Sequence, residues 1–156
     1  PMRALLRSVF LLLLCGVAAT AFAAPPVARD LAREEANRAL VVAFYEQFFN
    51  QHRVHEAARV VADDYRQHNP EVPDGKAPFV AFFAGFFHDN PGSRARIVRS
   101  ATDGDLVYLH VHSTSGPDDR GQAVVDIFRV VDGRIVEHWD VIQDVPAQAE
   151  NANTMF

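Results

Sequence analysis

The chain has 156 residues, with 20 acidic and 15 basic side chains, a formal net charge of −5 and a single lysine, Lys76. A nucleic-acid surface needs clustered lysine and arginine, so this balance argues against one. The sequence also lacks a G-x-S-x-G elbow, a P-loop and a G-x-G-x-x-G turn. The α/β-hydrolase and nucleotide-binding classes therefore lose their main support.

The first 23 residues have the pattern of a secretory signal peptide. Arg3 and Arg7 precede a short apolar run, and an A-F-A tripeptide closes the segment at 21–23. Such a run is too short to span a bilayer as a stable helix and is typical of a cleaved export signal. Cleavage after Ala23 removes two arginines and no acid, which leaves a charge of −7. We expect a periplasmic or secreted protein that is not attached to a membrane after cleavage.

Cys15 is the only cysteine, and it lies within the segment expected to be removed. The mature protein would then have no disulfide and no thiol nucleophile, although an exported protein could hold disulfides. A lipoprotein acylated at Cys15 is the alternative. It would need a small residue before the cysteine, where this chain has Leu14.

Three helices are predicted in the first half of the mature chain. They run from Val27 to Asn50, with Asp30 as the cap, from His52 to Ala62, and from Lys76 to His88. The second half of the first helix carries aromatic residues at three- and four-residue spacing, which is typical of a buried face. These residues are Phe44, Tyr45, Phe48 and Phe49.

Two histidine positions accompany these helices. His52 and His55 lie three residues apart, but no third ligand follows in the helix, so exposed helix residues are the better interpretation than a metal site. His68 stands at the end of a short extended piece before Asn69-Pro70. It either faces a cleft or holds the turn by hydrogen bonding.

The remainder of the chain is predicted as antiparallel strands over 93–102, 105–115 and 122–143. The last range is a hairpin, because Asp132-Gly133 between two β-branched runs favours a two-residue turn with positive φ at both residues. Residues 144–156 lack periodicity and are expected to form a partly disordered tail. Three helices packed on a curved antiparallel sheet make an α+β fold, with domain bounds at 24–145.

The hairpin supplies the first candidate site. With this turn, Asp126 pairs with Trp139 and Phe128 pairs with Glu137, so all four share one face, while His138 falls on the other. A carboxylate among aromatic rings is typical of a lined pocket. The alternative is that Asp126 is a solvated residue on the outer face.

The preceding strand places Tyr108, His110 and His112 on one face. The sequence does not fix its register against the hairpin, and a slip of one residue would separate both histidines from Asp126. If the faces agree, a carboxyl group and an imidazole can exchange protons in an aromatic chamber, as acid/base chemistry on a carbon acid requires. A metal site formed by the two histidines with His68, or two solvated histidines, are the alternatives.

These residues together resemble a known family. The segment from Tyr65 to Pro70, the Phe-rich helix, the strand at 125–129 and the D-G-R-I-V-E-H-W-D stretch at 132–140 resemble SnoaL-like polyketide cyclases of the nuclear transport factor 2-like superfamily. The similarity covers residues 34 to 145. It implies a cone-shaped α+β barrel, NTF2-like and often dimeric, with a hydrophobic pocket.

The resemblance also implies site residues. An aspartate helped by a histidine catalyses an intramolecular aldol condensation in the cyclases without a cofactor, and Asp126 and His112 match them. It further implies wall contacts at Trp139 and Phe128 and a residue near the mouth at His68. Tyr65 and His110 are further candidate substrate contacts. Gln143 departs from relatives that carry an acid after the Trp strand, and an export signal departs from cytoplasmic cyclases.

Two functions follow from this pattern. The first is an exported enzyme, of the lyase or isomerase type, that moves protons on a small hydrophobic carbonyl compound. The second is a non-catalytic module that binds a hydrophobic ligand or uses its sheet to dimerise. Neither one requires a metal or an organic cofactor.

Overall fold

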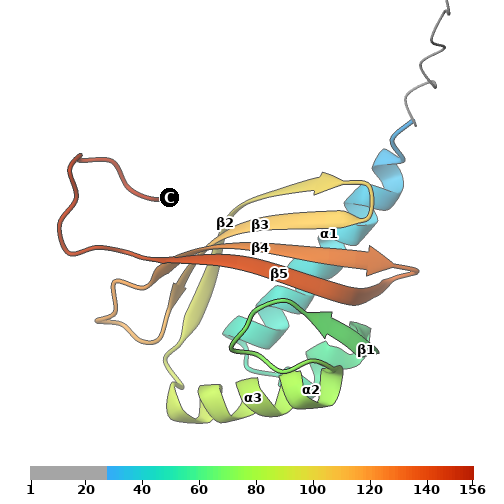
Figure 1. The fold of residues 1–156 in the computed structure, drawn as a ribbon, viewed down its shortest axis with the longest axis horizontal. Helices are drawn as coiled ribbons and strands as arrows, with labels where there is room; N and C mark the ends of the chain where they lie inside the picture. Colours follow the sequence, from blue (N-terminus) through green and yellow to red (C-terminus); the bar gives the residue numbers. More distant parts are fainter. Residues whose placement is uncertain (1–27) are drawn as a thin grey trace, which may run out of the picture.

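Helices and a curved five-stranded sheet make up residues 28–156, the part of the chain that the computed structural model describes (Figure 1). The predicted signal peptide and Cys15 lie outside the described residues. The helices are α1 (Leu31–Tyr45), α2 (Val54–Ala57) and α3 (Lys76–Asp89). The strands are β1 (Val61–Gln67), β2 (Arg94–Asp103), β3 (Leu106–Thr114), β4 (Gln122–Val131) and β5 (Arg134–Asp144). This confirms the predicted α+β class, with helices packed against a curved sheet that does not close.

The first helix changes its winding where it meets the core. Asp30 caps α1 by accepting a hydrogen bond from the backbone N–H of Arg33, at 3.1 Å, as the sequence predicts. The last predicted turns, Glu46–Asn50, form a π-helix. Such wide turns are rare and are often found at functional sites.

The predicted second helix over 52–62 is confirmed for 54–60 and wrong at its end, where 61 and 62 belong to a strand. Only α2 and a 3₁₀ turn at Ala58–Val60 are helical, and β1 begins at Val61. β1 pairs in parallel with β5, so the sheet has the order β1-β5-β4-β3-β2. A short apolar run such as V-V-A suits a helix or a strand equally, and the free edge of β5 provides the strand partner.

The predicted β4–β5 turn is confirmed, but the register beyond it is not. Asp132 and Gly133 have φ of 49° and 72°, as the two-residue turn requires. Val130 then pairs with Ile135, whereas Arg129 pairs with Glu137, which leaves Val136 as an extra residue in β5. This β-bulge reverses which side chains of β5 face the helices.

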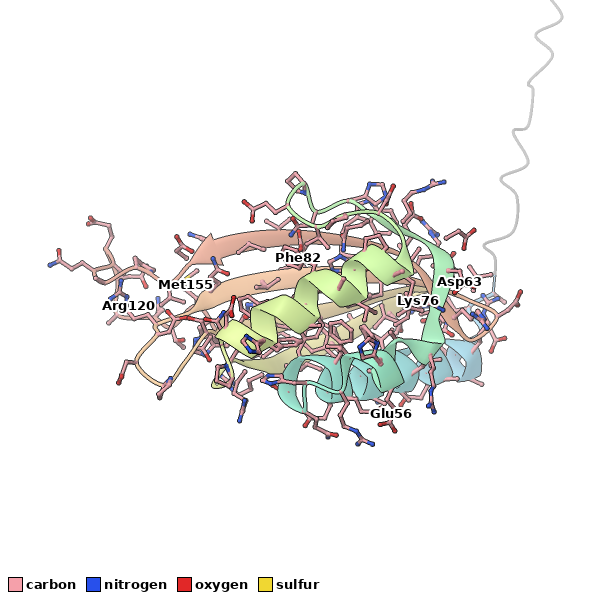
Figure 2. The ribbon with its side chains drawn as sticks, turned by 90° about the horizontal axis from the view of Figure 1, so that it is seen from below. Glu56, Asp63, Lys76, Phe82, Arg120 and Met155 are labelled. Atoms are coloured by element: carbon pink, nitrogen blue, oxygen red, sulfur yellow. The ribbon has the colours of Figure 1, made fainter. Side chains whose placement is uncertain are left out.

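Aromatic side chains fill the space between the helices and the sheet. The rings of Phe48 and Phe79 stack at 4.8 Å between centroids, and Phe44 meets Phe128 of β4 edge-on at 6.0 Å. The helical spacing that predicted a buried face for these residues is therefore confirmed. In the described residues, no helix has the length and apolar character to cross a membrane. Figure 2 shows α3 lying across the sheet beside α1 and α2.

Candidate functional site

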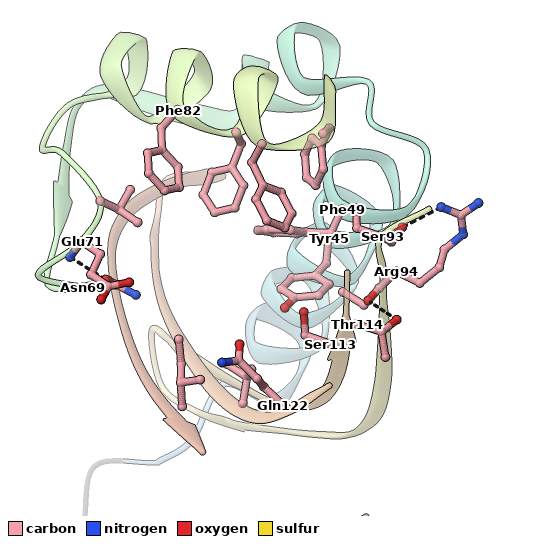
Figure 3. Close-up of a pocket in the computed structure, with 17 residues that line it drawn as sticks. Tyr45, Phe49, Asn69, Glu71, Phe82, Ser93, Arg94, Ser113, Thr114 and Gln122 are labelled. Atoms are coloured by element: carbon pink, nitrogen blue, oxygen red, sulfur yellow. Dashed lines mark hydrogen bonds between the residues drawn. The ribbon is translucent and has the colours of Figure 1, made fainter. Parts of the chain in front are cut away.

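An open cavity of about 210 Å³ lies between α3 and the inner face of the sheet (Figure 3). Four rings of α3 line it: Phe82, Phe83, Phe86 and Phe87. Tyr45 and Phe49 of the first helix form a second wall, with ring centroids 4.4 Å apart. The polar lining residues are Asn69, Glu71, Ser93, Arg94, Ser113, Thr114 and Gln122. The lining therefore suits a small molecule with an apolar part and some polar atoms.

Directly behind Tyr45 lies a buried carboxyl–imidazole pair. Asp126 and His138 are 5% and 7% exposed, and Asp126 Oδ1 is 2.9 Å from His138 Nε2. The Tyr45 hydroxyl donates to Asp126 Oδ2 at 2.7 Å. The ring of Phe128 packs against His138, with centroids 4.7 Å apart. Water has little access to this pair, so the hydrogen bonds act in a low-dielectric setting.

Tyr45 links this pair to the cavity. Tyr45 lines the cavity, and its hydroxyl contacts Asp126. Burial, and next the charge of Asp126, raise the pKa of Tyr45 well above its ordinary value of 10. The phenol therefore keeps its proton at neutral pH and can pass protons without becoming charged.

A second layer of polar side chains orients the pair. His138 Nδ1 is 2.8 Å from Gln67 Oε1, and Asn69 Nδ2 donates to Asp140 Oδ2 at 2.7 Å. β1 supplies Gln67 because it lies alongside β5, with Gln67 opposite His138 in the ladder. Within the described residues, every buried side-chain nitrogen and oxygen has a hydrogen-bond partner.

The same cluster offers a set of metal ligands. One donor atom each from Asp126, His138 and Asp140 lie within 4.8 Å of one another. Two carboxylates and an imidazole suit a divalent cation. However, the imidazole and the Asp126 carboxyl group already lie at hydrogen-bond distance, and Asp140 accepts from Asn69. A proton is sufficient to account for this geometry.

The structure does not bring His112 or His110 to Asp126. Leu109 pairs with Asp126 and shares its inward face, so the two histidines alternate to the outer face of β3. There the C-terminal Phe156 stacks on His112, with ring centroids 4.2 Å apart. The expected Asp126–His112 pair is therefore corrected, and a one-residue difference in register is the reason.

The other expected site residues divide between interior and exterior. Phe128 and Tyr65 are buried behind the lining, and Tyr65 packs on Phe79 at 5.2 Å between ring centroids. Trp139 faces outward because of the bulge, and His68 stacks on it at 4.7 Å. None of these four lines the cavity. The metal set of His68, His110 and His112 does not form a cluster among the described residues.

Sequence reasoning missed Tyr45 and His138. The helical spacing predicts only a core position for Tyr45, although its hydroxyl is the polar group in a run of phenylalanines and needs a partner when buried. That signal could have identified it. His138 was assigned to the opposite face from Asp126, and no local signal in the sequence marks the extra residue in β5.

The fold and this cavity define a class of small α+β proteins in which helices cover the inner face of a curved sheet. The model of the SnoaL-like domain matches residues 41–138, and the chain belongs to this family. The resemblance to this family that the sequence motifs indicated is thus confirmed. Comparison with curated proteins gives no match.

Solved structures with similar folds carry several different names. A proposed ketosteroid isomerase from Kribbella flavida is 24% identical, with a TM-score of 0.62, over 76% of this chain and 85% of its own. A proposed polyketide cyclase from Bacillus cereus is 20% identical, with a TM-score of 0.58, over 69% and 74%. A SnoaL-like protein of unknown function from Burkholderia thailandensis is 16% identical, with a TM-score of 0.57, over 68% and 96%. At these identities the similarity shows the fold alone.

Proposed function

We propose that this protein catalyses cofactor-independent acid/base chemistry on a small hydrophobic carbonyl compound held in the cavity. The observation that carries the proposal is the placement of Asp126 between the Tyr45 hydroxyl and the His138 imidazole, behind an aromatic cavity. The reaction would be of the aldol, isomerase or dehydratase type. The names of the similar structures include an isomerase and a cyclase, which agrees with this range.

Tyr45 gives the proposed reaction its route. A proton next to the substrate carbonyl passes to the Tyr45 oxygen as Tyr45 gives its own proton to Asp126 Oδ2. The reverse transfer returns a proton to carbon or oxygen. Because the pKa of Tyr45 is raised, the phenol is neutral before and after each transfer. Asp126 and His138 are buried, so water has little access to compete for the protons that they hold.

Exchange of carbon-bound hydrogen tests the proposal without knowledge of the natural substrate. A panel of small cyclic ketones and enones is incubated with the protein in D₂O, and loss of the α-hydrogen signals is followed by ¹H NMR. We expect protein-dependent exchange for at least one compound. Asp126→Asn should lower its rate by about 100-fold or more, because general acid/base groups contribute about 10²–10⁴-fold.

Asp132→Asn is the matched control. Asp132 is exposed in the turn with φ of 49°, a conformation that asparagine also tolerates. Its exchange rate should equal that of the unmodified protein. Equal exchange in Asp126→Asn and the unmodified protein would refute the role of Asp126. Ketone binding by NMR without exchange in either protein would support the non-catalytic binding module instead.

A further inference from the structure

We infer that Gln67 locks the tautomer of His138, so that the Asp126–His138 pair holds one shared proton in the resting protein. The inference deepens the proposed function, since it concerns the same site and names its starting protonation state. It follows from hydrogen-bond accounting among four residues. Gln67 itself does not line the cavity, so its role is that of a positioning residue.

The orientation of the Gln67 amide is fixed by the backbone. The Asn69 backbone N–H, which can only donate, lies 3.0 Å from Gln67 Oε1. The atom at that position must therefore be the carbonyl oxygen. The amide nitrogen points the other way, 3.4 Å from the Tyr65 hydroxyl. The usual ambiguity between the two ends of a glutamine side chain is thus removed.

The orientation of Gln67 in turn fixes His138. His138 Nδ1 lies 2.8 Å from the same Gln67 Oε1. An oxygen that accepts at this distance requires a proton on Nδ1. In a neutral imidazole with Nδ1 protonated, Nε2 carries a lone pair and can only accept. This lone pair would point at Asp126.

The remaining contact then requires an additional proton. His138 Nε2 and Asp126 Oδ1 are 2.9 Å apart. A lone pair and a carboxylate oxygen repel each other, so one proton must lie between them. It is present either as imidazolium with carboxylate or as imidazole with carboxylic acid. The Tyr45 hydroxyl cannot supply it, because Tyr45 donates to Oδ2.

The charged and titratable groups around the pair are compatible with this count. Tyr45 approaches from α1 and Tyr65 from β1, and burial raises the pKa of both phenols well above 10, which keeps them neutral. Asp140 on β5 accepts from Asn69, and one of its carboxylate oxygens lies within 4.8 Å of the pair. With the shared proton, Asp126 and His138 together carry no net charge, which suits their burial.

The shared proton makes acid catalysis available at the start of a reaction. To reach the substrate, the shared proton must first stand on Asp126 Oδ2, because Tyr45 contacts that oxygen. Tyr45 would then give its hydroxyl proton to the substrate oxygen and take the proton from Oδ2. One O–H bond forms on the substrate and one breaks on Asp126, so the proton count of the pair falls by one, and His138 keeps its proton on Nδ1. This order suits protonation of a carbonyl or hydroxyl oxygen, as in aldol and dehydration chemistry.

Ring-nitrogen NMR tests the inference without a substrate. Protein labelled with ¹⁵N in histidine is examined at neutral pH by long-range ¹H–¹⁵N correlation, with His138 assigned from a His138→Gln variant. We expect a protonated Nδ1 in the unmodified protein. Gln67→Leu should lose that proton, because Nε2–H can then donate to the Asp126 carboxylate. Gln67→Glu retains an acceptor and should keep Nδ1 protonated.

The control is Gln143→Leu, an exposed change of the same kind on β5, which should leave the His138 signals unchanged. An unprotonated Nδ1 in the unmodified protein, or identical His138 signals in Gln67→Leu, would overturn the inference. So would loss of the Nδ1 proton in Gln67→Glu. If equimolar Zn²⁺ shifts the Nε2 signal of His138, the position between His138 and Asp126 would hold a cation and not a proton, which would also overturn the inference. None of these outcomes depends on ketone exchange, so the proposed function stands or falls separately.

Discussion

The buried carboxyl groups of this protein accept hydrogen bonds from neighbouring side chains. Asp126 accepts from Tyr45 and contacts His138, and Glu34 on α1 has a comparable arrangement at the far end of the sheet. Each buried carboxyl group would be costly without such partners. The two sites differ in purpose, because Glu34 is not part of the lining of the cavity described above and ties the start of α1 to β2.

Glu34 should make stability depend on pH in the acid range. It is 1% exposed, and the Arg29 guanidinium, together with the Thr102 hydroxyl, lowers its pKa from 4.5 to about 2. A carboxyl group with a lowered folded-state pKa stabilises the fold above 4.5, and this contribution is lost as pH falls from 4.5 towards 2. In a plot of the urea unfolding midpoint against pH, Glu34→Gln should flatten the decline between pH 4.5 and about 2.

Glu35→Gln is the matched control for this titration. Glu35 is the neighbouring residue, is exposed and pairs with Arg38 at the surface, where ion pairs contribute little. Its removal should change the acid limb much less. Equal acid limbs for the Glu34 variant and the unmodified protein would show that Arg29 does not hold Glu34 in its charged form.

At the scale of elements, two local irregularities build the site. The π-helix at Glu46–Asn50 follows Tyr45, and Phe49 within it stands beside Tyr45 on the cavity wall. The bulge at Val136 turns His138 and Asp140 inward and Trp139 outward. A regular helix and a regular hairpin would place these side chains differently, so the site depends on both departures.

The β3–β4 connection also has an element that only glycine can supply. Gly121 has φ of 78°, and a Cβ there would lie 2.1 Å from the Ser113 carbonyl oxygen. Gly104, in the turn between β2 and β3, serves for comparison. Its φ is 62°, and a Cβ there would have open space around it. Gly104→Ala should cost about 1 kcal/mol from backbone strain alone. Gly121→Ala should cost about 3 kcal/mol or more, since the strand must also move.

Urea unfolding of the two glycine variants measures this difference. The comparison isolates the clash, because both positions carry the penalty of positive φ. The same free energy of unfolding in both variants would mean that the β3–β4 loop shifts to accommodate the new Cβ at position 121 without a loss of stability. It would also weaken the case that Ser113, which lines the cavity, is held rigidly by this turn.

At the scale of the whole molecule, the outer face of the sheet carries an apolar pair that faces away from the cavity. Val125 and Val141 lie opposite each other on β4 and β5 and are 41% and 69% exposed. Apolar side chains gathered on one face suggest an interface. The homodimer expected from the sequence remains a prediction, as does export to the periplasm or the medium.

Val141→Lys tests the dimer directly. If two copies bury this face, a charge at its centre should shift the protein from dimer to monomer in size-exclusion chromatography with light scattering. Val131→Lys is the control, because Val131 is 42% exposed at the hairpin end, beside the turn. A monomeric unmodified protein, or a dimer that survives Val141→Lys, would contradict the prediction.

Local patterns determined much of this protein. The Asp132-Gly133 turn, the Asp30 cap, the buried aromatic face of α1 and the extent of α3 follow from turn chemistry, capping and periodicity, which act over a few residues. The motif stretches were also enough to identify the SnoaL-like family. Local alternation also put Asp126 and Phe128 on the same face of β4, and both are buried.

The tertiary structure alone decided which groups meet Asp126. His138 replaced His112 because one extra residue in β5 and the register of β3 reverse the alternation of side chains, and both are set by pairing between distant segments. Gln67 reaches His138 only because β1 joins the open edge of β5. Alternation along a strand is local, but the face that becomes the interior depends on the whole sheet.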